Sequence, residues 1–390
     1  MSQLKVNTIR HTGASSDAVT LATDGTCTAK ITNNLGNKNL VVNGSCLISQ
    51  RGVSSTTNGY GTVDRMKCTF RADADEACTQ QQVDVASGTT PYNLGFRKAV
   101  KQTNGNQTSG AQAASYAQII YAIEAQDIAT SGWNYTSASS YITISFWAKA
   151  SVSQTYNLHL ESSDGTAQLY SHSYALSANT WTKVTTTIPG NSNITINNDN
   201  GPGLYIVLDQ YLGTQYTTSG HTSNTWAAAG SWNDMGPDMT TTWWTTNDAT
   251  FEMTGLQLEV GDVATDFEHR SYGDELARCQ RYYFIMNSDD GDASMFGLGW
   301  ASATNYFQNF VRFPVSMRDT PSALEQTGTA SNYRVNWSGG NSNCTTAPTF
   351  ATATKYSSSF YVQATGLTTN MGGFLRSNDN SAYIAWSAEL

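Results

Sequence analysis

Residues 254–283 constrain the fold more than any other part of this 390-residue chain. Apolar and polar side chains alternate through residues 256–260, which is the two-residue period of a half-buried β-strand. Gly261 and Asp262 then end the alternation with residues that favour turns. Further on, apolar side chains recur at the helical spacing i, i+3 and i+7, at Leu276, Cys279 and Tyr283. The stretch therefore predicts a last strand, a turn and a short helix that leads into a new domain.

The same stretch closely resembles a junction in structural proteins of marine tailed bacteriophages. In that family a jelly-roll module, similar to carbohydrate-binding modules, ends with a QLE-G-AT-FE-R segment and continues into an EL-CQRYY linker. The matching residues of this chain are Gln257, Leu258, Glu259, Gly261, Ala264, Thr265, Phe267, Glu268, Arg270, Glu275, Leu276, Cys279, Gln280, Arg281, Tyr282 and Tyr283. The resemblance implies a jelly roll before residue 270 and a helical linker over residues 271–283.

The start of that jelly roll is also matched. The family's NL-VNG, QRG and DR patterns stand here at residues 39–44, 50–52 and 64–65, and Met66 replaces a frequent Trp. Eight strand candidates follow, at residues 67–70, 94–99, 116–123, 141–149, 156–161, 180–188, 203–208 and 250–260. Eight or more strands within residues 39–270 predict a jelly-roll β-sandwich. Residues 116–124 are also rich enough in Ala and Ile for a helix, but their β-branched and aromatic content favours a strand.

Composition supports an all-β protein and excludes several functions. Charged residues make up 13% of the chain, against roughly 25% in ordinary soluble proteins, while aromatic residues reach 11%. A net charge of −9 without a basic run argues against nucleic-acid binding. The sequence shows neither a signal-peptide core nor a membrane-spanning run, so we expect synthesis in a host cytoplasm and no membrane insertion.

The six cysteines do not have the spacing of a zinc site. Because disulfides are rare in a reducing cytoplasm, we expect free and mostly buried thiols. A bond between Cys68 and Cys78 stays open as an alternative if these residues flank a hairpin.

Residues 1–38 are too few to enclose a core of their own. Short alternating segments at residues 4–9, 18–21 and 26–31 predict strands whose apolar faces would be buried if three chains wound around one axis. The segment resembles the intertwined β-prisms of phage fibres, which implies trimerisation and attachment to the virion. A flexible tail is the alternative.

Residues 284–390 form the third region, a predicted β-sandwich-like tip domain. Residues 310–318 resemble the F-PV-MR strand of phage fibre tips, and the chain end resembles their closing W-AEL. Alternation through residues 383–388 predicts a strand that reaches the C-terminus and packs in a sheet or an interface.

Motifs of catalysis are missing: the chain has no G-x-S-x-G, H-E-x-x-H or Walker sequence, so we expect a protein without enzymatic activity and without a cofactor. His159 and His172 could face each other across a hairpin, either as a metal pair or as an exposed polar pair. Two acidic groups, Asp73, Asp75 and Glu76 and then Asp289, Asp290 and Asp292, are interpreted as solvated turn acids. A structural calcium ion at the second group remains possible.

The long insertion at residues 209–246 carries the strongest ligand-binding signal. Sugar rings stack on aromatic faces while amide and acid groups bind their hydroxyls, and long loops in compact domains are often functional. The predicted glycan-binding residues are Tyr211, Tyr216, Trp226, Trp232, Asp234, Trp243 and Trp244. The alternative is that these rings pack a satellite core or a subunit contact. Trp147 and Trp181 lie on predicted strands and are expected in the core.

The sequence thus predicts a homotrimeric, all-β virion protein, a tail fibre or receptor-binding spike that adheres to host-surface glycans. Its partners would be other copies of itself and the tail or capsid proteins that hold its N-terminal segment. A capsid-decorating head fibre or knob of the same domain type is the alternative. A polysaccharide depolymerase is a further one, although the chain lacks a convincing pair of catalytic acids.

Overall fold

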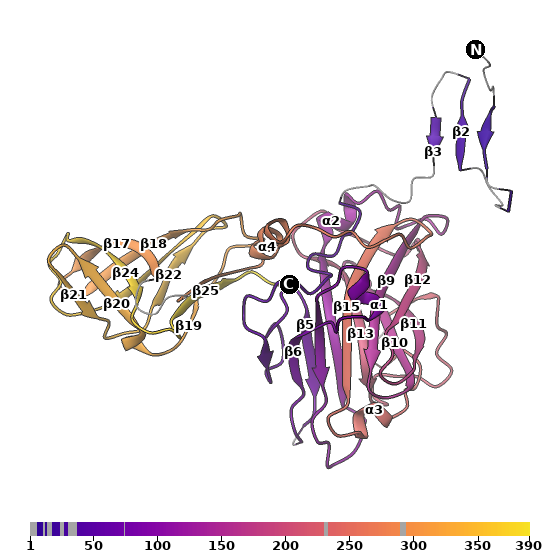
Figure 1. Cartoon of the computed structure of the whole chain (residues 1–390), viewed down its shortest axis with the longest axis horizontal. Coiled ribbons are helices and arrows are strands. Elements are labelled where there is room, and N and C mark those ends of the chain that lie inside the picture. Colours follow the sequence, from indigo (N-terminus) through magenta and orange to yellow (C-terminus); the bar gives the residue numbers. More distant parts are fainter. Residues whose placement is uncertain are drawn as a thin grey trace.

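The computed structural model describes residues 6–10, 12–13, 18–23, 27–29, 37–73, 75–229, 233–288 and 294–390. Nearly all regular structure in these residues is antiparallel β-sheet, which confirms the predicted all-β class. Figure 1 shows a small N-terminal sheet, a large β-sandwich and a C-terminal β-sandwich, with helix α4 (Tyr272–Gln280) between the two larger parts. None of the helices in the described residues is long and apolar enough to cross a membrane.

The large sandwich consists of two six-stranded sheets. The first sheet has the order β14-β11-β10-β13-β8-β5, formed by Trp226–Ala228, Gln168–Leu176, Gln154–Ser162, Pro202–Leu212, Tyr116–Glu124 and Lys67–Arg71. The second has the order β12-β9-β15-β7-β6-β4, formed by Thr182–Pro189, Tyr141–Ala150, Thr250–Val260, Lys98–Thr103, Thr79–Asp84 and Ser54–Ser55. Inward-facing side chains of both sheets, such as Ile119, Leu208 and Ile144, share one buried core.

Most predicted strands are present with small changes of boundary. Strand β8 confirms the strand interpretation of residues 116–124, because its side chains alternate between the core and the outer face. The strand expected at residues 94–99 begins only at Lys98, since the short helix α1 (Thr90–Asn93) and Gly95, with a φ of 101°, turn the chain first. The other short helices are α2 (Ala125–Ala129), α3 (Thr242–Thr245) and a 3₁₀ turn at Ala330–Asn332.

Strand β15 is buried on both faces, not on one as its alternation predicts. Leu256 and Leu258 face the sandwich core, whereas Gln257 and Glu259 are buried on the outer face. A strap formed by residues 261–270 covers that outer face and binds both polar side chains.

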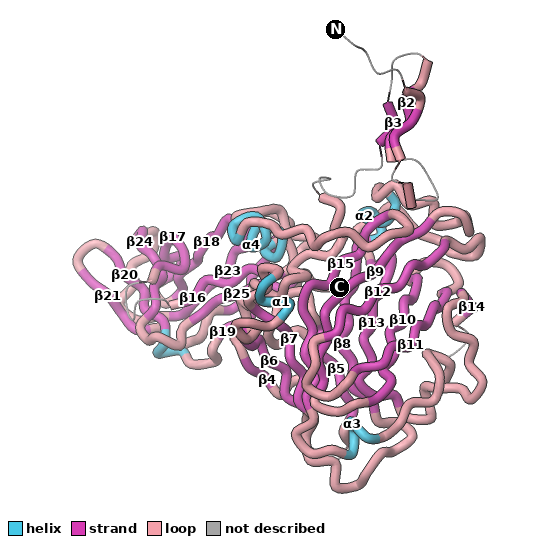
Figure 2. The backbone as a smooth tube through the Cα atoms, turned by 45° about the vertical axis from the view of Figure 1, so that its right-hand side comes forward, coloured by secondary structure: helices cyan, strands magenta, loops and turns pink. Residues whose placement is uncertain are grey.

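The N-terminal residues form a three-stranded antiparallel sheet of β1 (Thr8–Ile9), β2 (Val19–Leu21) and β3 (Cys27–Ala29). This sheet stands away from the rest of the chain in both views (Figures 1 and 2). Ile9 and Leu21 are exposed. None of the described side chains of β1 and β2 is therefore buried in a core.

The C-terminal domain combines a seven-stranded sheet with a three-stranded one. The larger has the order β21-β20-β24-β17-β18-β23-β22, formed by Gly340–Asn343, Tyr333–Trp337, Gly372–Ser377, Met295–Ala303, Tyr306–Arg312, Ser357–Gln363 and Thr349–Ala353. The smaller has the order β16-β25-β19, formed by Tyr283–Asn287, Tyr383–Ser387 and Glu325–Gln326. The strand expected over residues 310–318 ends at Arg312, two residues before a proline that cannot donate to a sheet.

Cys46, Cys68, Cys78, Cys279 and Cys344 are free and buried. Cys68 and Cys78 are therefore not bonded to each other. Cys279 is buried on helix α4 as its spacing predicts, but Leu276 is half-buried and Tyr283 lies on strand β16, because the helix ends at Gln280.

The two sandwiches meet at a junction whose residues are far apart in the sequence. The carboxylate of Glu389 pairs with the guanidinium of Arg65 and lies 3.2 Å from Arg51 Nη1. The side chains of Arg65 and Glu389 are only 1% and 6% exposed. The Arg65 guanidinium lies 3.6 Å from the ring centroid of Tyr282, and that of Arg51 lies 3.5 Å from the centroid of Tyr283. The junction is thus a buried ionic cluster placed on two aromatic rings.

The last three residues complete this junction. Strand β25 stops at Ser387, so it does not reach the C-terminus as predicted. Arg318 instead holds the chain end, because its Nε donates to the Ala388 carbonyl at 2.6 Å and its Nη2 to the Glu389 carbonyl at 3.0 Å. Its Nη1 donates to the Asn200 carbonyl of the large sandwich at 2.6 Å.

A second ion pair fixes the end of helix α4. The buried carboxylate of Glu124 accepts two hydrogen bonds from Arg281, at 2.8 and 2.7 Å, and one from the Tyr282 hydroxyl at 2.6 Å. Burial raises the pKa of Glu124 while these bonds lower it, and the net shift is downward. Glu124 is therefore charged at neutral pH and ties the linker to strand β8.

Candidate functional site

Three of the predicted sugar-stacking rings lie in the sandwich core. Tyr211, Trp243 and Trp244 are buried, and the rings of Tyr211 and Trp244 stack with centroids 5.3 Å apart. The indole N–H of Trp243 donates to the Thr250 carbonyl at 3.2 Å, so its only polar group is used inside the protein. A fully buried ring offers no face to a sugar, which contradicts the predicted role of these three residues and favours the packing alternative.

The other predicted residues do not form one surface. Trp226 lies on edge strand β14, packs on Tyr170 and donates its N–H to the Pro189 carbonyl at 2.7 Å. Tyr216 packs edge-on against Tyr116 of β8, which is separated from β14 by three strands of the sheet. Trp232 lies outside the described residues.

Asp234 belongs to a chain of hydrogen bonds that resembles a hydrolase triad. His221 Nε2 lies 2.5 Å from Ser171 Oγ, and His221 Nδ1 lies 2.6 Å from Asp234 Oδ1. Ser171, however, is completely buried on paired strand β11, where no substrate carbonyl can approach its hydroxyl. The chain of bonds fastens the insertion to the outer face of the first sheet.

The candidate metal positions have other partners. Leu158 is the register partner of His172 and Ser171 that of His159, so the two histidines point to opposite faces of the hairpin. His159 Nδ1 instead lies 2.8 Å from the buried Asp209 carboxylate. Within the described ranges, no three metal-ligating side chains gather at one point. The possible calcium group at Asp289, Asp290 and Asp292 lies outside those ranges.

The first acidic group has a structural role in its turn. Asp75 accepts hydrogen bonds from the Thr108 hydroxyl at 2.7 Å and from the Ser109 amide at 3.0 Å, while Glu76 accepts from the Asn106 amide at 2.8 Å. The hydrogen bonds from Thr108 and Ser109 lower the pKa of Asp75, although desolvation opposes them. These acids therefore tie two loops together.

An aromatic pocket lies on the outer face of the second sheet, where sequence analysis expected only core. The pocket has a volume of about 240 Å³. Trp147 of strand β9 is half-buried there, because residues 143–149 place every second side chain outward. The remaining walls include Phe96, Lys183, Asp266, Phe267 and His269. Trp181 is half-buried on the same face outside the pocket, with the Lys149 ammonium 5.1 Å from its ring centroid.

The rings opposite Trp147 support one another. The centroids of Phe96 and Phe267 are 4.9 Å apart, and His269 lies 5.1 Å from Phe96 and 4.9 Å from Phe267. The Nε2 atom of His269 contacts the Leu94 carbonyl at 2.9 Å, which holds the imidazole at the pocket edge. These contacts fix the shape of the aromatic wall without a ligand.

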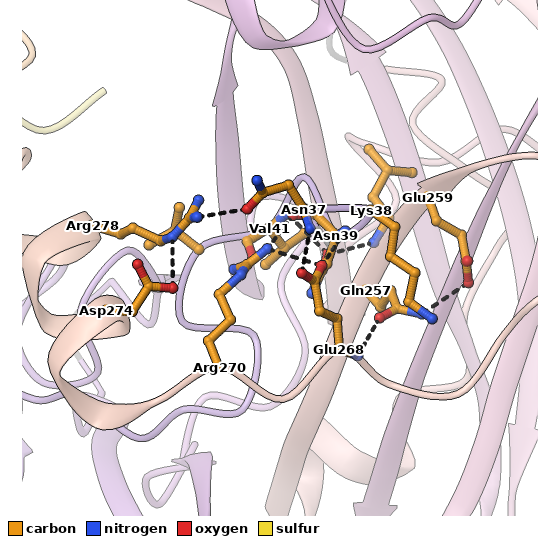
Figure 3. A network of polar contacts seen from close by, with 12 residues as sticks. Asn37, Lys38, Asn39, Val41, Gln257, Glu259, Glu268, Arg270, Asp274 and Arg278 are labelled. Atoms are coloured by element: carbon orange, nitrogen blue, oxygen red, sulfur yellow. Dashed lines mark hydrogen bonds and ion pairs between the residues drawn. The ribbon is translucent and has the colours of Figure 1, made fainter. Parts of the chain in front are cut away.

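The strap at residues 261–270 carries this wall and is anchored by the residues of the QLE-G-AT-FE-R pattern (Figure 3). Glu259 accepts from the Thr265 amide at 2.9 Å, and Gln257 accepts from the Glu268 amide at 2.9 Å. The Glu268 carboxylate in turn accepts from the Asn39 amide at 2.7 Å, while Arg270 donates to the Val41 carbonyl at 3.0 Å. The residues of this pattern therefore bind residues 37–41 through hydrogen bonds and hold the strap over the sheet.

The pocket offers the two kinds of contact that a polyhydroxylated ring needs. Trp147 and Phe267 present apolar aromatic surface, while Lys183 and Asp266 are exposed and can donate to and accept from hydroxyl groups. Sequence reasoning missed this site because it assigned Trp147 to the core. The signal that identifies it is the phase of the strand: Trp147 alternates with Phe146 and Ala148, which face inward.

Comparisons with known proteins give only distant similarity. No protein-family model and no curated protein matches the chain. Among solved structures, the enzymatically active domain of tailspike protein 4 from bacteriophage CBA120 has a TM-score of 0.31 and 11% identity, covering 57% of this chain and 22% of that one. A CBM4 carbohydrate-binding module has a TM-score of 0.29 and 13% identity, covering 56% and 98%. The xylan-binding CBM22-1 domain from Paenibacillus barcinonensis has a TM-score of 0.28 and 9% identity, covering 58% and 96%. Because these scores are low, we describe the fold of the sandwich by its own strand order and not by these structures.

Proposed function

We propose that this chain is a virion fibre or receptor-binding protein of a tailed bacteriophage, and that it adheres to glycans on the host surface through the pocket at Trp147. The virion assignment rests on the sequence resemblance of residues 39–65, 254–283 and the chain end. The glycan assignment rests on one observation, the pocket itself: a pre-formed aromatic wall faces Trp147, and an ammonium group and a carboxylate stand at its rim.

We further propose that the protein is a homotrimer whose N-terminal segment attaches it to other virion proteins. The exposed Ile9 and Leu21 of the β1–β3 sheet support this, since apolar strands without a core of their own gain stability from neighbouring chains. Three copies would also bring three weak sugar sites to one surface, and linked sites bind far more tightly than single ones.

The glycan proposal is tested by comparing Trp147→Ala with Trp181→Ala on an array of bacterial surface polysaccharides. Trp181 is a matched control, because it is a half-buried tryptophan on the same sheet face but outside the pocket. Trp147→Ala should lose at least about tenfold in affinity, because covering the exposed half of the ring, about 100 Å², contributes roughly 2.5 kcal/mol at about 25 cal/mol per Å². Trp181→Ala should bind as the unsubstituted protein does, and melting curves should show that both variants fold.

Two results would refute the assignment. If the unsubstituted protein binds none of the polysaccharides, glycan adhesion is wrong for this chain. If it binds but Trp147→Ala binds equally well, the sugar lies elsewhere.

A further inference from the structure

One face of the C-terminal seven-stranded sheet is apolar and uncovered. Leu298 and Trp300 of β17 are 66% and 50% exposed, and Phe310 of β18 is 54% exposed. Leu298 and Phe310 are direct register partners, and Phe374 of β24 is the partner of Leu298 on its other side. Tyr361 of β23 lies on the same face but is separated from Trp300 by Gln308 of β18. Leu298, Phe310 and Phe374 therefore form a continuous apolar row across three neighbouring strands, with Trp300 next to Leu298 on the same face.

The size of this patch matches that of apolar patches that often have a function. The exposed halves of three aromatic or large aliphatic side chains alone amount to roughly 300 Å², taking half of the 150–250 Å² that a large ring can bury. Met295, which is 57% exposed, and the half-exposed Phe374 extend it. The largest apolar patch on a typical single chain measures roughly 300–600 Å² and is often functional.

The chemistry of the patch favours a protein partner over a sugar. Its central side chains carry no charge, and among its strands only Arg312, Arg334 and Arg376 place charged groups on this face, at its margins. Leu298 and Phe374 would leave sugar hydroxyls without hydrogen-bond partners, which is costly. An apolar centre with a polar rim is instead the arrangement of a subunit interface.

A second copy of this chain is the partner that the molecule itself supports. The β1–β3 sheet, far along the sequence from the patch, also exposes apolar side chains, at Ile9 and Leu21. Identical chains that associate side by side bring their β1–β3 sheets together and also their apolar patches. Such an association would cover both surfaces at once. We propose that the outer face of the seven-stranded sheet, centred on Leu298 and Phe310, is an interface between copies of this chain. The inference rests on the self-association proposed above and assigns it a surface in the C-terminal domain.

The test uses the full chain and the substitutions Leu298→Glu and Phe310→Glu, with Val53→Glu as control. Val53 is 61% exposed on the large sandwich, so its substitution adds the same charge away from the patch. In sedimentation equilibrium, the unsubstituted protein and the control should have a mass that is a multiple of 42.2 kDa. The two patch variants should dissociate at concentrations at least about tenfold higher than the control, with unchanged secondary structure.

Oxidative footprinting of Trp300 and Met295 provides a second measurement that does not depend on a substitution. In the assembled protein both side chains should be oxidised at least about fivefold more slowly than the exposed Tyr356, when each rate is divided by that of the same residue in the unfolded chain. Footprinting therefore tests the interface even if the N-terminal segments alone hold the two patch variants together and their mass does not change.

The outcomes separate this inference from the proposal that it rests on. A single-chain mass for the unsubstituted protein overturns both. An oligomer in which Trp300 is oxidised as fast as an exposed residue overturns the interface and leaves self-association intact. Protection of Trp300 that begins only when polysaccharide, anionic vesicles or another virion protein is added also overturns it, because the patch would then bind that partner.

Discussion

Replacing Glu389 with alanine should uncouple the unfolding of the two sandwiches. This carboxylate is the only acidic group paired with Arg65 and Arg51 at the junction in the described residues. Removing it leaves two guanidinium groups without a counter-charge, one of them 1% exposed. Arg65 keeps its hydrogen bond to the Ala122 carbonyl and its contact with Tyr282, but neither of these neutralises its charge.

The expected cost follows from this burial. Breaking a buried ion pair by removing one partner typically costs about 3–5 kcal/mol, because the remaining charge is left without compensation. Glu389→Gln should cost less, about 1.5–3 kcal/mol, since the amide keeps the shape and can still accept a hydrogen bond. The exposed pair of Lys98 and Asp84 is the control, and Asp84→Asn should cost about 1 kcal/mol or less.

Calorimetry and denaturant titration measure these differences. We expect the unsubstituted protein to melt with its two sandwiches coupled, and Glu389→Ala to show a separate, earlier transition of the C-terminal domain. Limited proteolysis should then cut the variant near residues 281–288. If Glu389→Ala melts like Asp84→Asn, the ionic cluster does not hold the domains together and the structural reasoning fails.

Three further outcomes test the core, the pH dependence and the chain end. Trp243→Ala should lower the free energy of unfolding by about 3–5 kcal/mol in denaturant titrations, because the ring is fully buried; a loss below about 1 kcal/mol would contradict its place in the core. Burial raises the pKa of Asp64 from 3.8 to about 6, so the folded state disfavours its charged form and stability falls as the pH rises between these values. Asp64→Asn should remove this loss of stability with rising pH. If the melting temperatures of both proteins change equally with pH across that range, the prediction is wrong. Deleting residues 383–390 removes the central strand of the smaller C-terminal sheet and the buried Trp386, so light scattering should detect aggregation; a soluble variant with unchanged melting would contradict this.

Local patterns predicted the strands well because their causes are local. Alternation and β-branched content lie within a few residues of each other, so β15 was predicted at residues 250–260 with the boundaries that the structure has. Strands β6 and β11 were missed because glutamine, serine and histidine at many of their positions hide the two-residue period. In β11, several of these polar side chains are buried through contacts with other segments, which a local pattern cannot show.

The site residues predicted from the sequence differ from those of the proposed pocket for a related reason. A position in a loop predicts an exposed ring, but α3 folds Trp243 and Trp244 back into the core between the sheets. Conversely, a position on a strand predicts a buried ring, although Trp147 is on the outward phase of β9. The exposure of a ring depends on the face of the strand on which it lies and on the segments that cover that face. The sequence indicates the first but not the second.

Within the strap, the anchoring side chains and the side chains that line the pocket have different physical roles. Gln257, Glu259 and Glu268 make hydrogen bonds within the protein that anchor the strap, and their side chains do not line the pocket. Asp266 and Phe267 lie on the same strap but face the pocket, and no anchoring bond uses their side chains. A change at Asp266 or Phe267 should therefore alter the ligand without loosening the strap, whereas a change at Glu259 should loosen it whatever the ligand. Resemblance at the anchoring residues thus predicts the scaffold of the site and includes Phe267, while the proposed choice of sugar also depends on Trp147, Lys183 and Asp266, which this resemblance does not include.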